Sequence, residues 1–237
     1  MKRPAVHWWR TGFFLIPAIT VYTIILGSVS LLSTLIDRRG YTAHRCARMW
    51  ARLILWTTGV RVEIKGALPP VGVSYVFASN HQSFYDIPVI FSTLPHQLRI
   101  IAKSSLGAFP FLGWHLHLAG HLLVNRDHPG ASVFKKMQRM VSQGASLIIF
   151  PEGTRSRDGR VARFKGGVFL LAIESGLPVV PISVAGSRHV MLKGRLMTCP
   201  GDVTITVHEP ISTSGLTRED ARPLAARVQA VVAGAAS

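Results

Sequence analysis

The chain has 237 residues, enough for one sizeable hydrophobic core. Apolar residues make up 48% of it and charged residues only 16%, which excludes an intrinsically disordered chain and is unusually apolar for a freely soluble domain. Lysine and arginine outnumber aspartate and glutamate by 27 to 11, and the net charge of +16 predicts an acidic partner. Because the arginines stand beside long apolar runs, we expect that partner to be anionic lipid. Cys46 and Cys199 fit no metal-ligand spacing and are interpreted as reduced thiols of a cytosolic compartment.

The N-terminal part carries an uncharged stretch of 25 residues, 12–36. A helix over residues 18–36 would be roughly 28 Å long, close to the hydrocarbon thickness of a bilayer, and Pro17 suits its start or a kink. Three basic residues precede the stretch and five follow it, so the following side is predicted to be cytoplasmic. Residues 41–60 have the pattern of a basic amphipathic helix at the membrane interface. A single span and a helical hairpin dipping into one leaflet both remain open. The expected location is the inner (cytoplasmic) membrane, with the remainder of the chain on its cytoplasmic side.

After residue 60 the pattern changes to short apolar runs separated by turn residues, with helical stretches between them. The expected strands are residues 61–66, 73–79, 98–103, 120–125, 146–151, 178–184 and 202–209, and the expected helices are 84–93, 132–143, 167–175 and 218–233. This alternation predicts an α/β fold with a mixed, largely parallel sheet flanked by helices. The chain is therefore divided into a membrane-anchoring helical segment, 1–60, and an α/β domain, 61–237, which the motifs below make the candidate catalytic domain.

The stretch "FASNHQSFYD" places His81 and Asp86 directly after a predicted strand. It fits a hydrophilic turn, and it equally fits a catalytic base with the carboxylate that orients it.

A second polar turn follows a predicted strand in "SLIIFPEGTRSRDG". Its candidates are Glu152, Gly153, Thr154 and Arg155, because ligand-binding loops of α/β proteins lie at the carboxyl ends of strands. Gly153 permits close approach of the backbone to a ligand, and Arg155 offers a planar fork for phosphate oxygens. An ordinary charged turn remains equally open for this segment alone.

Three further cations stand at the ends of predicted elements, namely Lys103, Arg126 and Lys165. Each one alone is more often a solvated surface charge. Their common position at strand or helix ends, in a chain that also carries His81 and Asp86, favours an anion-binding role.

Other chemistries have weaker support. "WHLHLAGH" has histidines at alternate positions but no nearby cysteine or carboxylate, so no metal is predicted. Ser83 near His81 suggests a serine hydrolase, yet the chain has no G-x-S-x-G sequence. It also has no Walker A sequence, and its aromatic residues are not interleaved with basic ones as in nucleic-acid binders. No nucleic-acid partner is therefore expected.

Four blocks, "NHQSFYD", "GHLLVNR", "FPEGTRS" and "VVPISV", follow one another in this order. Together they resemble the lysophosphatidate acyltransferase family, the 1-acyl-glycerol-3-phosphate O-acyltransferases, over about residues 60–210. H-x4-D alone is a weak signal, but H-x4-D followed by E-G-T-R after about 65 residues is a strong one.

The resemblance implies transfer of a fatty acyl group from acyl-CoA or acyl-acyl carrier protein to the sn-2 hydroxyl of lysophosphatidate, giving phosphatidic acid without a cofactor. It implies that His81 removes the proton from that hydroxyl while Asp86 orients the imidazole. The implied binding residues for the acceptor phosphate are Arg126, Glu152, Gly153, Thr154 and Arg155, aided by Lys103 and Lys165, with Pro181 and Ile182 shaping the acyl or acceptor pocket.

The acceptor is less sharply specified than the reaction. Lysophosphatidate is favoured because paired arginines fit a phosphate monoester. Another lysolipid, such as lyso-ornithine lipid, is an open alternative. A non-catalytic lipid-binding protein at the membrane surface is the alternative from another class.

Overall fold

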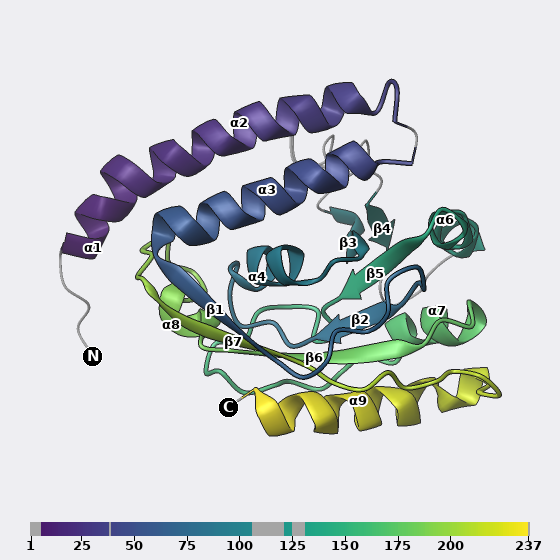
Figure 1. Ribbon diagram of the computed structural model, residues 1–237. Helices are drawn as coiled ribbons and strands as arrows, with labels where there is room; N and C mark the ends of the chain where they lie inside the picture. Colours follow the sequence, from purple (N-terminus) through teal and green to yellow (C-terminus); the bar gives the residue numbers. More distant parts are fainter. Residues whose placement is uncertain (1–5, 38, 106–120, 125–130, 237) are drawn as a thin grey trace.

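The computed structural model describes residues 6–37, 39–105, 121–124 and 131–236 (Figure 1). Within this part of the chain, seven strands form one sheet in the order β1-β7-β6-β2-β5-β3-β4. The strands are β1 Val60–Lys65, β2 Val76–Ser79, β3 Gln97–Lys103, β4 Leu122–Val124, β5 Ala145–Ile149, β6 Val179–Ala185 and β7 Gly201–Val207. The neighbours from β6 to β4 are parallel, β1 and β7 are parallel to each other, and β6 and β7 pair antiparallel. The mixed, largely parallel sheet expected from the sequence is confirmed.

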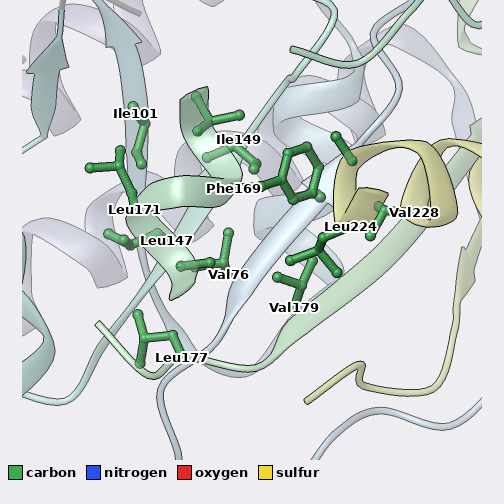
Figure 2. Packing of buried hydrophobic residues seen from close by; sticks show 14 of the residues in the cluster. Val76, Ile101, Leu147, Ile149, Phe169, Leu171, Leu177, Val179, Leu224 and Val228 are labelled. Atoms are coloured by element: carbon green, nitrogen blue, oxygen red, sulfur yellow. The ribbon is translucent and has the colours of Figure 1, made fainter. Parts of the chain in front are cut away.

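Helices cover both faces of the sheet (Figure 1). They are α3 Tyr41–Thr58, α4 Asp86–Thr93, α6 Ala131–Ser142, α7 Gly167–Glu174, α8 Ser187–Val190 and α9 Ala221–Ala235. One core cluster joins the sheet to α3 and α4, and the other joins it to α6, α7 and α9. In Figure 2, Phe169 of α7 lies near Leu224 and Val228 of α9, beside the apolar side chains of the central strands.

The central strands are apolar on both faces because both faces are covered. Every residue of β2 and β5 is buried, and β6 is buried up to its last residue. Such continuous apolar runs are typical of parallel strands between two helical layers. Inside these strands the polar side chains Ser146 and Ser183 are buried and hydrogen-bonded, and the larger polar side chains follow the strand ends.

The N-terminal stretch is a continuous helical element, Val6–Ser33. It consists of α1 Val6–Trp9, a π-helical turn Arg10–Leu15 and α2 Ile16–Ser33, so it begins well before the expected residue 18. Pro17 does not interrupt it, since a widened turn just before a proline tolerates the missing N–H donor. The helix is long and apolar enough to cross a membrane by length and composition alone.

This long helix lies along α3, which in turn packs on α4 (Figure 1). Tyr22 shares a hydrogen bond with Thr57, and the Trp50 indole donates to Thr23 at 3.0 Å. At the other end, Arg10 donates to the Thr58 carbonyl at 2.7 Å. The helix is thus fastened to the rest of the protein at several points along its length.

A buried arginine of β3 holds the turn between α2 and α3. The Arg99 side chain donates to the carbonyls of Arg39 and Gly40, and Gln97 donates to the same Arg39 carbonyl. Gly40 has a positive φ of 71°, and a Cβ there would lie 2.5 Å from the Arg99 guanidinium. The sheet and the N-terminal helices are therefore joined by the Arg99 guanidinium, which lies against a turn whose positive φ favours glycine.

Candidate active site

The candidate site lies where the neighbouring strands β6, β2 and β5 reach their carboxyl ends. β2 leads into Asn80 and His81, β5 leads into Glu152, and β6 leads into Ser187. Because these three strands are parallel, their carboxyl ends meet at one edge of the sheet. Residues that are far apart in the sequence thus converge on one small volume.

His81 and Asp86 form the centre of this volume. Nδ1 of His81 lies 2.7 Å from Oδ2 of Asp86, and the Asp86 side chain is 0% exposed against 16% for His81. The same Oδ2 accepts hydrogen bonds from the backbone N–H groups of Gln82 and Ser83 at 2.8 and 3.0 Å. Because a carboxylate only accepts, Nδ1 carries the proton, and Nε2 is the ring nitrogen with a free lone pair.

The imidazole is also fixed in its plane. Its ring stacks on Phe150 with the ring centroids 4.1 Å apart. The hydrogen bond to Asp86 and this aromatic contact together set the direction in which Nε2 points. The two residues predicted from "NHQSFYD" are brought together in the geometry of an oriented base.

The other carboxylate oxygen of Asp86 has a different partner. Oγ of Ser187 donates to Oδ1 at 2.5 Å, and Ser187 is fully buried. Ser187 opens the short helix α8 after Gly186, whose φ is +86°. The sequence analysis missed this residue, because a serine far along the chain carries no signal until the sheet order is known.

Glu152 holds the histidine loop from the neighbouring strand. Its Oε1 accepts from the His81 backbone N–H at 2.7 Å, and its Oε2 accepts from the Ala162 N–H at 2.9 Å. Burial raises the pKa of the Glu152 carboxyl. Both oxygens are occupied by protein donors, so the geometry favours a positioning function for Glu152 over the direct phosphate contact expected from the sequence.

Arg155 faces the site from the turn after Glu152. Its guanidinium carbon lies 3.6 Å from the centroid of the Phe84 ring. Nη1 is buried and makes no hydrogen bond within the described part of the chain, and burial lowers the pKa of the guanidinium. A buried, unpaired N–H group of this kind favours an anionic ligand.

Lys193 fixes the same turn from the segment after α8. Its Nζ donates to Oγ1 of Thr154 at 3.0 Å and to the backbone carbonyl of Arg155 at 2.6 Å. Gly153 has a φ of +79°, which favours glycine at this position. Neither Lys193 nor Phe84 was selected from the sequence, since each acts only through a contact made in the folded chain.

The remaining predicted residues lie elsewhere or are not described. Arg126, like His115 and His117, lies outside the described residues, and Lys103 ends β3. Pro181 and Ile182 are buried inside β6, where Pro181 pairs with Ala78 of β2.

Lys165 lines a separate open cleft of about 600 Å³. Arg163, Arg222 of α9 and Gln229 of α9 line the same cleft. The backbone connects this cleft to the site, because the Lys165 N–H donates to the Pro151 carbonyl.

Comparisons with known proteins identify the family of this chain. The sequence profile of the family described as "Acyltransferase" matches residues 59–185. The chloroplastic 1-acyl-sn-glycerol-3-phosphate acyltransferase BAT2 of Brassica napus is 36% identical over 76% of this chain and 54% of its own length. The alpha form from Homo sapiens is 31% identical over 92% of this chain and 78% of its own length.

Among solved structures, the 1-acyl-sn-glycerophosphate (LPA) acyltransferase of Thermotoga maritima superposes with a TM-score of 0.71. It is 25% identical, and the match covers 92% of this chain and 93% of that one. The chain spans about half the length of several of the curated relatives it matches. The profile match covers more than half of the sequence and includes both polar loops of the site. The chain belongs to the acyltransferase family.

Proposed function

We propose that the protein transfers a fatty acyl group from a thioester to the sn-2 hydroxyl of 1-acyl-sn-glycerol 3-phosphate. The observation that carries this proposal is the oriented pair of His81 and buried Asp86, close to a turn whose Arg155 offers an unpaired N–H group. The names of the relatives support the same acceptor. The site therefore combines a group that binds phosphate with a general base beside it.

The proposed reaction is a direct transfer. Nε2 of His81 takes the proton of the sn-2 hydroxyl as its oxygen attacks the thioester carbonyl. The carbon–sulfur bond then breaks, and the proton on Nε2 passes to the departing thiolate. Asp86 stabilises the imidazolium that exists between these two steps and keeps the Nδ1–H tautomer. The mechanism assigns no covalent role to Ser83, because its Oγ donates to the Met191 carbonyl at 2.9 Å.

Arg155 is assigned to the phosphate of the acceptor. Stacking on Phe84 fixes the plane of the guanidinium, and Lys193 fixes the backbone that carries it. A planar fork held in this way suits two phosphate oxygens, and binding the phosphate there positions the sn-2 hydroxyl relative to Nε2 of His81. Arg126, which follows β4 in the sequence, is proposed to assist.

The basic cleft lined by Arg163, Lys165 and Arg222 is assigned to the phosphates of the thioester donor. It adjoins the catalytic loops, since the Ala162 N–H donates to Glu152, which in turn accepts from the His81 N–H. Its three cationic side chains suit the nucleotide end of acyl-CoA. Acyl carrier protein is the alternative donor, because its acidic surface has the same charge.

The N-terminal helices are assigned to one leaflet of the cytoplasmic membrane, with the site on the cytoplasmic side. Helix α2 is fastened along α3, and its outward side chains include Ile24 and Ile25, which are 62% and 57% exposed. If this helix crossed the bilayer along its normal, α3 would also lie in the hydrocarbon because the two helices pack together. Burial of the three arginines of α3 in hydrocarbon would be costly. An orientation parallel to the membrane surface avoids that cost and supports the hairpin alternative.

The test is a product analysis with a panel of acceptors. Purified protein in mixed micelles is given palmitoyl-CoA with lysophosphatidate, lysophosphatidylcholine, lyso-ornithine lipid or glycerol 3-phosphate. We expect rapid formation of phosphatidic acid and much slower use of acceptors without a phosphate monoester. Preferred acylation of lyso-ornithine lipid would replace the acceptor, and binding of all the lipids without thiol release would support the non-catalytic alternative.

A further inference from the structure

We infer that Ser187 is a positioning residue of the acyl transfer, which sets the basicity of His81 through the buried carboxylate of Asp86. This inference rests on the proposed function. Oγ of Ser187 lies 2.5 Å from Oδ1 of Asp86, and both side chains are 0% exposed. Oδ2 of the same carboxylate takes its bonds from His81, Gln82 and Ser83. The hydroxyl of Ser187 is therefore the donor that satisfies Oδ1 within the described part of the chain.

Two features of the fold place Ser187 at this distance. Gly186 turns the chain at the end of β6 with a φ of +86°, and a Cβ there would lie 2.4 Å from the Asp202 carbonyl. The Asn80 side chain donates to the Val184 carbonyl at 2.9 Å and accepts from the Val184 N–H at 2.8 Å. Asn80 thus extends the pairing of β2 with β6 by one further step. The segments that carry His81 and Ser187 are held in a fixed register by this contact.

The direction of the effect follows from charge. When His81 is neutral, Asp86 has an unbalanced negative charge, and a donor on Oδ1 stabilises it strongly. When His81 is protonated, the imidazolium already neutralises much of that charge, and the same donor matters less. Removal of the Ser187 hydroxyl therefore destabilises the neutral-histidine state more than the protonated state. Because both side chains are fully buried, bulk water has no direct access to replace the hydroxyl.

In the described part of the chain, Glu152 and Arg155 interact electrostatically with this pair, and neither replaces Ser187. Glu152 accepts from the His81 backbone through Oε1, and its second oxygen is occupied by Ala162. Arg155 attracts Asp86 electrostatically but stacks on Phe84 and makes no described hydrogen bond to the carboxylate. Both are left unchanged by a substitution at position 187.

The chain offers a matched control in Ser183, four residues earlier. Ser183 is also 0% exposed, and its Oγ bonds to the Val232 carbonyl and to His208. Ser183→Ala therefore removes a buried hydroxyl from β6, the strand that leads into Ser187, without touching Asp86. Ser187→Cys keeps a weak donor of similar shape at the tested position.

The experiment compares wild type, Ser187→Ala, Ser187→Cys and Ser183→Ala by pH–rate profile and by NMR titration of the His81 imidazole. For Ser187→Ala we expect kcat to fall roughly 10-fold to 100-fold and the acid limb of kcat/KM to move to higher pH. The KM for lysophosphatidate should change little, and Ser187→Cys should lie between wild type and Ser187→Ala. Ser183→Ala should keep the wild-type profile.

Two results would overturn the inference. One is an unshifted His81 titration in Ser187→Ala, and the other is a rate loss equal to that of Ser183→Ala. NMR also separates this inference from the proposed function. If the wild type acylates no lysolipid while the His81 titration still moves in Ser187→Ala, the proposed function fails and the positioning effect stands. If Ser187→Ala does not fold, Ser187→Cys still gives the titration.

Discussion

Two regions of this molecule reverse the usual distribution of polar and apolar side chains, in opposite directions. At the strand ends, Asp86 and Ser187 are fully buried, and Glu152 is 7% exposed. On the N-terminal helix, Phe13 and Leu32 are 75% and 66% exposed. A buried charge is tolerable only when donors surround it, and an exposed apolar row is favourable only beside something other than water. In the function proposed above, the buried polar region serves the head group of a lipid acceptor and the exposed apolar row contacts lipid hydrocarbon.

The largest expected effect comes from the buried polar region. Asp86→Asn keeps the size of the side chain but places an amide where Oδ2 accepts from three N–H groups. We expect kcat to fall about 10²-fold to 10⁴-fold because the imidazole loses its tautomer and its counter-charge. Steady-state kinetics measure the loss, and circular dichroism checks that the fold is kept. A turnover within a few-fold of wild type would mean that the buried carboxylate is only structural.

His44 tests the junction between the two regions, because it is buried under the turn that joins α2 to α3. Burial, followed by the charges of Arg99 and Arg48, lowers its pKa to about 4. Between pH 6.5 and 4, the unfolded chain binds a proton that folded His44 does not. The free energy of unfolding should therefore fall by up to about 3 kcal/mol as the pH drops through this window.

His44→Asn, which retains an acceptor for the Leu98 N–H, should remove most of this acid sensitivity. Denaturant unfolding in detergent at pH 7 and pH 4.5 measures the difference between the two proteins. His189→Asn, at an exposed position, is the control, and its free energy of unfolding should fall between pH 7 and pH 4.5 as much as that of wild type. If the free energy of unfolding of His44→Asn fell between pH 7 and pH 4.5 as much as that of wild type, other groups would cause the acid sensitivity.

The exposed apolar region is tested by Ile24→Ser, Ile25→Ser and Val29→Ser in one protein. Full burial of one such side chain contributes roughly 1.5–3 kcal/mol, and shallow insertion contributes a part of it. We expect binding to anionic vesicles to weaken tenfold or more, while transfer in detergent micelles stays close to wild type. The control carries Ala230→Ser and Ala233→Ser on exposed positions of α9. Equal binding of the two variants would place the membrane contact elsewhere.

The smallest effect is expected from Arg155→Lys. The charge remains, but the planar fork and the stacking on Phe84 are lost. We expect the KM for lysophosphatidate to rise several-fold to about tenfold, with a smaller change for the thioester. With an acceptor that lacks the phosphate, the kinetics of wild type and Arg155→Lys should differ much less. A rise in the thioester KM alone would assign Arg155 to the donor.

Much of the fold follows from local sequence pattern. All seven strands and the flanking helices except α8 were expected, because apolar runs bounded by turn residues predict a doubly covered sheet. The four-residue helix α8 was not expected, since it is too short to show a periodic pattern. The start of the N-terminal helix was expected too late, since Pro17 was given too much weight as a boundary. The order of the strands was beyond reach, because β2 pairs with β5 and β6 through contacts between distant segments.

In the candidate site, too, some residues could be predicted from local sequence and others could not. His81 and Asp86 are five positions apart, so their pairing is visible in the sequence. Ser187 and Lys193 act on residues far from them in the chain, and only the sheet order brings them into contact. The two backbone N–H groups that bind the oxygens of Glu152 are equally invisible before folding. Sequence pattern identifies the chemical groups here, while the structure identifies the groups that hold them.

The central claim is that His81 is the base of an acyl transfer to a lysolipid. The most direct measurement is single-turnover transfer from palmitoyl-CoA to lysophosphatidate by wild type and His81→Ala, with phosphatidic acid quantified by mass spectrometry. Our account predicts that His81→Ala binds vesicles like wild type and forms product at least about 10²-fold more slowly. Formation of phosphatidic acid by His81→Ala at a rate near that of wild type would contradict it.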